Sequence, residues 1–139
     1  MAPSHTLFTN RLGGRVAVLG WHLDLVFHKM YRPMRRKLYL ALLDRLNGSP
    51  LEMAVESGEQ EFVRHGVLAD GSELVAVTRL SIDADDSVPL RLARTPKSVG
   101  RLSPKGAWEA VAFERKDPLL VEVGAPLVCG EPVVLRFVF

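Results

Sequence analysis

The sequence has little of several features that mark particular classes of protein. Cys129 is the only cysteine, which excludes an intrachain disulfide framework and a cysteine-rich zinc site. The 18 Lys and Arg nearly balance the 16 Asp and Glu, so no strong general field draws the chain to nucleic acid. The longest apolar runs, 16–21 and 38–43, are far shorter than the roughly 20 residues that cross a bilayer. The first ten residues lack the apolar centre of a secretory signal. We therefore expect a soluble chain that binds neither nucleic acid nor membranes, and we leave open a signal on a longer parent protein.

The chain has 139 residues, 47% of them apolar and 24% charged, which is typical of a globular protein of one domain or of a small domain with a fragment of another. Its two parts differ in pattern. Residues 1–49 contain one strand-like and one helix-like run, whereas residues 50–139 contain short alternating runs separated by Gly, Pro and Asp. This pattern of short alternating runs is typical of an antiparallel β domain.

In the first part, the small and β-branched apolar residues of 15–21 predict a strand covered on both faces. The Gly13-Gly14 pair precedes this strand, whereas the glycines of a phosphate loop follow one. A helix is predicted from near Pro33, with an apolar stripe at helical spacing. Asn47-Gly48 supplies its stop signal.

In the second part, strands are predicted near 52–57, 60–68, 73–82, 88–93, 98–102, 107–113, 119–123 and 132–139. Asp70-Gly71 marks a hairpin turn that needs a positive φ. Two further turns are predicted, at 83–86 and 115–118. The strand around 74–80 alternates imperfectly, which favours a central place in its sheet. The sequence thus predicts a mainly β fold: an antiparallel β-sandwich, immunoglobulin-like or similar, with one N-terminal strand and one α-helix.

No motif identifies a catalytic centre, a resident metal or a cofactor. His22, Asp24 and His28 lie close together, but their spacing matches no named metal motif; a small free-standing enzyme that uses these three side chains is the alternative in another functional class. We attribute the aspartates of 83–86 to a hairpin turn. Alternation turns most strand glutamates to solvent. Cys129 is expected to be a small buried or half-buried thiol.

A cationic cluster surrounds the predicted start of the helix, and it consists of Lys29, Arg32, Arg35, Arg36 and Lys37. Positive charge there opposes the helix dipole, so helix stability does not explain it. An acidic partner would explain it. We interpret the cluster as an interface with another domain or subunit, which includes the option of a homo-oligomer.

Four aromatic residues outside the phenylalanines could stack on sugar rings: Trp21, Tyr31, Tyr39 and Trp108. The strand position of Trp21 favours packing. Trp108 follows a Pro-Lys-Gly loop and is predicted to be the more exposed ring. A weak carbohydrate-binding module that uses Trp108 or Tyr31 is therefore a second functional hypothesis.

The order of elements resembles the C-terminal region of bacterial β-galactosidase-like multidomain glycoside hydrolases. Residues 10–20 resemble the last strand of their trimerisation-like α/β domain, and the helix through 38–43 resembles its closing helix. Residues 78–83 with 88–92 resemble the central hairpin of the terminal β domain, and 127–135 resemble its final strand.

The resemblance implies a fragment or detached accessory domain, since the catalytic glutamates of these enzymes lie in a barrel that this chain lacks. The function it implies is a non-catalytic structural domain that supports an upstream catalytic domain or subunit. On this hypothesis the purified chain hydrolyses no glycoside, and it binds sugars with a dissociation constant weaker than about 1 mM.

Overall fold

The computed structural model describes residues 5–20, 33–57 and 60–139, with the backbone alone for 33–36. The chain divides into two compact units, Met1–Leu51 and Glu52–Phe139. Each unit has its own architecture and is described by itself.

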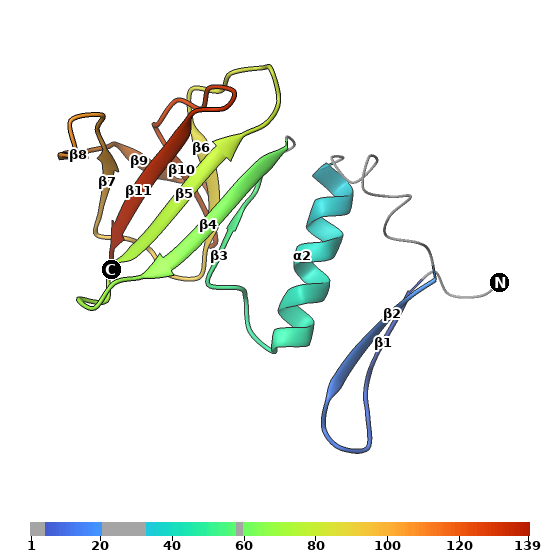
Figure 1. Ribbon diagram of the computed structural model, residues 1–139. Helices are drawn as coiled ribbons and strands as arrows, with labels where there is room; N and C mark the ends of the chain where they lie inside the picture. The colour runs from blue at the N-terminus through green and yellow to red at the C-terminus, as the bar shows by residue number, and fades with distance from the viewer. Residues whose placement is uncertain (1–4, 21–32, 58–59) are drawn as a thin grey trace. The chain divides into compact units, whose positions relative to one another are not determined.

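The first unit contains an antiparallel hairpin and a helix. Strands β1 (His5–Thr9) and β2 (Arg15–Leu19) pair in register from His5 opposite Leu19 to Thr9 opposite Arg15 (Figure 1). The sequence predicted one strand here, and β1 was missed. Gly13, at φ +83°, belongs to the hairpin turn, and the side-chain oxygen of Asn10 accepts hydrogen bonds from two backbone amides of this turn. The glycine pair therefore forms the turn between two strands.

Helix α2 (Pro33–Asn47) has the predicted bounds. Proline suits the first turn because the backbone amide it lacks would have no partner within the helix. Gly48, at φ +86°, ends the helix in the left-handed region, and its amide donates to the carbonyl of Asp44 at 2.8 Å. The carboxylate of Asp44 accepts a hydrogen bond from the amide of Leu51 at 2.9 Å. The chain therefore leaves the helix along a defined path.

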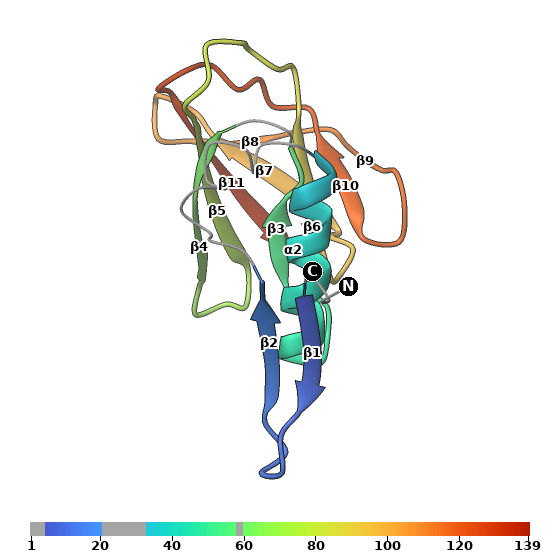
Figure 2. The same cartoon turned by 90° about the vertical axis from the view of Figure 1, so that its right-hand side faces the viewer.

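The second unit consists of two antiparallel sheets, which confirms the predicted fold class. One has the order β3-β6-β10-β9 and the other the order β4-β5-β11-β7-β8. Figure 2 shows β4, β5 and β11 on one side and β6, β10 and β9 on the other. The strand bounds are β3 (Met53–Val55), β4 (Glu61–Val67), β5 (Glu73–Arg79), β6 (Val88–Leu92), β7 (Ser98–Leu102), β8 (Trp108–Ala110), β9 (Phe113–Arg115), β10 (Leu120–Val123) and β11 (Pro132–Val138).

The core lies between these two sheets and is built by alternation. Every second residue of β5, β6, β10 and β11 is buried, while its neighbours along the strand are half-buried or exposed. Strand β5 lies between β4 and β11, so its predicted central place is confirmed. The buried apolar residues of the core are Val55, Val75, Val77, Val88, Leu90, Leu92, Val99, Val121, Val123, Ala125, Leu127, Val133, Leu135 and Phe137.

Two of the three predicted turns form hairpins, and the third does not. Gly71, at φ +80°, turns β4 into β5, and residues 115–118 lie at the turn between β9 and β10. Residues 83–86 were predicted as a hairpin turn, and this prediction was wrong. Strands β5 and β6 belong to different sheets, so the segment between them carries the chain across the sandwich. The central hairpin in the family resemblance is not formed either.

The predicted strand at 107–113 is divided between the two sheets. Trp108–Ala110 pairs with β7 as the edge of the five-stranded sheet, whereas Phe113–Arg115 pairs with β10 as the edge of the other. The amide of Val111 donates to Val99, and the carbonyl of Ala112 accepts from Gly124. The chain therefore changes sheets at these two residues, a corner that a continuous alternating pattern does not reveal.

Candidate functional site

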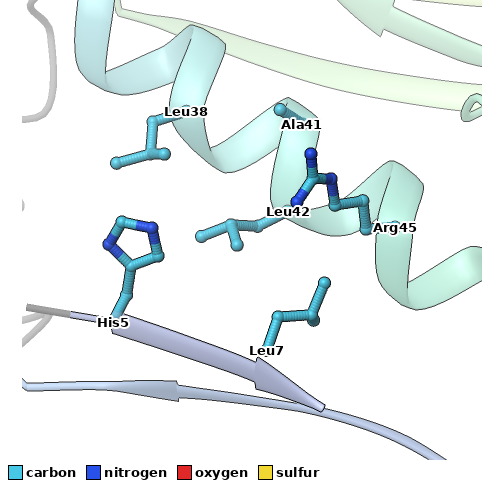
Figure 3. A pocket seen from close by; sticks show the side chains of 6 residues that line it. All are labelled: His5, Leu7, Leu38, Ala41, Leu42 and Arg45. Carbon is cyan, nitrogen blue, oxygen red and sulfur yellow. The ribbon is translucent and has the colours of Figure 1, made fainter. Parts of the chain in front are cut away.

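A pocket of about 430 Å³ lies in the first unit, between the hairpin and α2. Figure 3 shows His5 and Leu7 reaching toward the helix from β1. The helix contributes residues at positions i, i+3, i+4 and i+7, which share one face. The floor of the pocket is apolar, and the side chains of His5 and Arg45 add nitrogen atoms to its lining. The helix residues of the lining are Leu38, Ala41, Leu42 and Arg45.

The register of the hairpin determines which residues share the face toward α2. Leu7 pairs with Ala17, and Thr9 pairs with Arg15, so these residues lie on the pocket face. Arg15 also donates to the carbonyl of Leu46, near the end of the helix, at 3.4 Å. This contact independently places that face of the hairpin against α2.

The opposite face of the hairpin is also apolar. Phe8 pairs with Val16, and Val18 occupies the same face two residues further on. Phe8 is 49% exposed and Val18 is 50% exposed. Among the described residues of this unit, Leu42 is the one buried apolar side chain, with 8% exposure. The hairpin thus has apolar residues on both faces, and the described helix faces one of them.

A second, shallower pocket of about 290 Å³ lies in the second unit, over β7, β8 and β11. Trp108 lines it and is 41% exposed, which confirms the prediction of an exposed ring. A side chain at Gly100 would meet the Trp108 ring at 3.6 Å, so the indole lies against the strand at the glycine. The other lining residues are Ser98, Val99, Glu109, Ala110, Arg136 and Val138.

Arg136 is held in this pocket by the β4–β5 turn. Its Nε donates to Ser72 Oγ at 3.1 Å, and its Nη2 forms an ion pair with Asp70. Hydrogen bonds from the Ser72 hydroxyl and amide, followed by the charge of Arg136, lower the pKa of Asp70 below 3.8. The turn that joins two strands therefore also orients a cation on the outer face of the sheet.

This lowered pKa predicts an acid-dependent contribution to stability. The unfolded chain binds the Asp70 proton more readily than the folded one, so the stabilisation is complete above pH 3.8 and is lost as the pH falls through the lower folded-state value. We expect Asp70→Asn to lower the melting temperature at neutral pH and to flatten its decline toward pH about 3. Asp86→Asn, in an exposed loop, is the control and should leave the profile unchanged. An unaltered profile for Asp70→Asn would contradict the linkage.

A buried ion cluster lies where β4 begins and β5 ends. Arg79 is 1% exposed, and its Nη2 contacts Glu61 Oε1 at 3.2 Å. The same guanidinium pairs with Asp85 and donates from Nη1 to the carbonyl of Asp83 at 3.0 Å. Ser57 Oγ donates to Glu61 Oε2 at 2.5 Å. The segment between β5 and β6 is therefore tied to the sandwich through one buried arginine.

Burial acting alone would lower the pKa of Arg79, but the hydrogen bonds and charges of Asp85 and Glu61 outweigh it and raise that pKa. Arg79 therefore stays charged at every working pH. Its Nε has no hydrogen-bond partner among the described residues, so the cluster is only partly satisfied. The expectation that most strand glutamates face solvent does not hold for Glu61, because a cross-strand arginine neutralises it inside the sandwich.

Glu73 is a second buried glutamate, and the same correction applies to it. Its Oε1 pairs with Arg94, and its Oε2 lies 2.9 Å from His65 Nε2. The Arg94 guanidinium also lies over the ring of Phe139, 4.2 Å from its centroid. Glu73 therefore joins the first residue of β5 to β4 and to the segment after β6. Among the described residues of the second unit, Glu61 and Glu73 are thus two buried carboxylates with cationic partners.

Several residues singled out from the sequence lie outside the described part of the chain. These are Trp21, His22, Asp24, His28, Lys29, Tyr31 and Arg32. Arg35 and Arg36 fall in the first turn of α2, where only the backbone is described, and Lys37 follows as an exposed residue. The predicted cationic interface and the three-residue alternative enzyme site therefore remain predictions.

Cys129 was expected to be at least half-buried, and this was wrong. It is exposed in the segment that leads to β11, where it forms a β-bridge with Arg79. Its backbone is thus held by the sheet while the thiol stays outside the core.

Within the described ranges, no group of three or more His, Cys, Asp and Glu side chains could hold a metal ion. None of the described helices is long and apolar enough to span a membrane.

No local sequence pattern marks Arg79 or Arg136 as part of a site. Each is an arginine within an apolar strand, at a position where alternation alone gives no partner. Asp70-Gly71-Ser72 was recognised as a turn, but its contact with Arg136 joins residues 66 positions apart in the sequence.

Comparison of the chain with protein-family models, curated proteins and solved structures gives no match.

Proposed function

We propose that this chain is a non-catalytic accessory domain of a carbohydrate-active enzyme, and that its first unit packs against an upstream catalytic domain or subunit. The observation that carries the proposal is the hairpin with apolar residues on both faces. The exposed face has Phe8 and Val18, each about half exposed. A sheet that is apolar on both sides is typical of α/β domains, whose sheets are covered on both faces.

The energetics of the first unit support this role. A two-stranded hairpin is at best marginally stable in water by itself. Covering half-exposed side chains such as Phe8 and Val18 would contribute roughly 1 kcal/mol each, if full burial contributes about 1.5–3 kcal/mol. The link to carbohydrate comes from the family that the order of elements resembles, in which an α/β domain precedes a terminal β domain.

The second unit suits a structural support. Its buried apolar core lies between its own two sheets. Its buried carboxylates, Glu61 and Glu73, are neutralised by Arg79 and Arg94, an arrangement that joins strands. A general acid for glycoside cleavage instead needs a carboxyl group that faces its sugar.

The proposal predicts unequal protection of the two units in the isolated chain. In hydrogen exchange, we expect the amides of β1 and β2 to exchange at least about a hundredfold faster than those of β5 and β11, because local opening costs less than global unfolding. The same preparation should show no turnover of aryl β-galactosides or of β-linked oligosaccharides. Equal protection of β1 and β11, or measurable hydrolysis that survives further purification, would overturn the proposal.

A matched pair of variants tests the exposed face directly. Phe8→Asp should leave the thermal unfolding of the second unit unchanged, and it should weaken co-purification with the polypeptide encoded immediately upstream. Thr6→Asp adds the same charge on the same face without removing an apolar contact, so it separates loss of packing from introduced charge. Unaltered association of Phe8→Asp would show that this face is not the interface.

A further inference from the structure

We propose that the concave patch around Trp108, on the outer face of the five-stranded sheet, binds one neutral pyranose ring of an oligosaccharide. In this site the Trp108 indole stacks on the sugar, and the side chains of Arg136 and Ser98 donate hydrogen bonds to its hydroxyl groups. The choice of a sugar rests on the proposed function, whereas the site itself rests on the geometry of β7, β8 and β11.

The register of the sheet brings these residues to one face. Arg136 pairs with Gly100, Gly100 pairs with Ala110, and Val138 pairs with Ser98. Their neighbours Phe137 and Val99 are buried in the core. Because side chains alternate along a strand, the first set must point outward. The outward positions of three adjacent strands therefore form a continuous floor.

The indole of Trp108 lies over Gly100. A Cβ at Gly100 would be 3.6 Å from the Trp108 ring, an ordinary van der Waals distance. An aromatic ring laid over a strand glycine is a known means of covering it. With this support on one side and 41% of its surface exposed, Trp108 offers a fixed apolar face, against which the C–H groups of a pyranose can pack.

The pocket has the size of a single sugar ring. Its volume of about 290 Å³ lies just below the roughly 300–1,000 Å³ typical of small-molecule sites. The lining combines apolar groups with a few polar ones, as such sites require: Trp108, Ala110 and Val138 are apolar, whereas Ser98 and Arg136 carry donors.

Charge selects a neutral sugar over an acidic one. The guanidinium of Arg136 is already paired with Asp70. With its charge compensated by this carboxylate, it offers little attraction to a second anion. Arg136 uses Nε and Nη2 for its bonds to Ser72 and Asp70. Its Nη1 has no partner in the part of the chain that the structure describes, and it remains able to donate to a hydroxyl group.

The test is an NMR titration of the full chain, labelled with nitrogen-15, with lactose, cellotetraose and trigalacturonate. We expect the two neutral sugars to shift the Trp108 indole signal and the Gly100 amide saturably, with a dissociation constant of about 1 mM or weaker. Trigalacturonate should bind at least about tenfold more weakly, because Asp70 already compensates Arg136 and repels a further carboxylate. Trp108→Phe distinguishes this indole signal from that of Trp21.

Trp108→Ala should abolish the shifts, and Trp108→Tyr should retain them because it keeps an aromatic face. Arg136→Gln should weaken binding about tenfold, the loss of one charged hydrogen bond. Phe62→Ala removes a different half-exposed ring from the same face of the sheet and should change nothing. If Trp108→Ala does not fold, the variants Trp108→Tyr and Arg136→Gln still test the sugar site.

Three results would overturn the site: no saturable shift, binding that survives in Trp108→Ala, or equal binding of trigalacturonate. The absence of a saturable shift would also favour a protein partner, instead of a sugar, as the ligand that covers this face. These measurements contain no upstream partner and record no turnover, so a negative result leaves the accessory role standing. Conversely, hydrolysis by the chain would overturn the accessory role without removing a sugar site at Trp108.

Discussion

Replacing Arg79 with leucine is expected to destabilise the second unit by about 3–5 kcal/mol, because it leaves a buried carboxylate without its cation. The side chain of Glu61 has 0% exposure, and Arg79 is its cationic partner. Loss of the guanidinium also frees Asp85 and the carbonyl of Asp83. Urea unfolding should show a lower midpoint with an unchanged slope, the sign of lost stability without a change in unfolded area.

The double variant Arg79→Leu with Glu61→Leu tests whether the unpaired charge is the cause. Replacing a whole buried ion pair by apolar residues is often neutral or even stabilising, so we expect the double variant to be more stable than Arg79→Leu alone. Arg64→Leu, on the outward side of the neighbouring strand, is the matched control and should change stability by at most about 0.5 kcal/mol. A double variant as unstable as the single one would refute this explanation.

Replacing Phe137 with alanine is the second large expected effect. Phe137 is fully buried between the sheets, and its ring stacks near that of Phe139, with 6.5 Å between centroids. Removing a buried aromatic side chain costs about 3–5 kcal/mol through lost transfer energy and an unfilled cavity. Chemical denaturation monitored by circular dichroism measures the change.

The matched control lies one residue further along β11. Val138→Ala alters an outward position that is 40% exposed, and we expect a loss below about 1 kcal/mol. The total stability of a domain is about 5–15 kcal/mol, so Phe137→Ala removes a large share of it. Similar losses for the two variants would mean that the sheets do not enclose Phe137 as described.

Local patterns in the sequence predicted most of the elements. Proline at the start of α2 and glycine after its end act through their own backbone geometry, so both bounds could be predicted. The same holds for Gly71, whose positive φ suits a short hairpin turn. Strand β1 was missed because polar residues interrupt its alternation, and the turn glycines could equally introduce a single strand.

The candidate sites could be predicted only in part. The exposure of Trp108 followed from its place after a turn-rich loop. Its contact with Gly100 and its nearness to Arg136 depend on strands that come from separate parts of the chain. The side of a strand that meets another sheet depends on pairing, which no local pattern encodes.

By itself, the sequence determined where the helix lies, where most strands lie and that the fold is mainly β, since backbone preferences and alternating polarity act over a few residues. The tertiary structure alone decided that residues 80–87 cross from one sheet to the other, that Glu61 and Glu73 are buried with arginines, and that Arg136 shares a pocket with Trp108. These outcomes depend on which strands become neighbours, and that choice is made by the burial of the whole core.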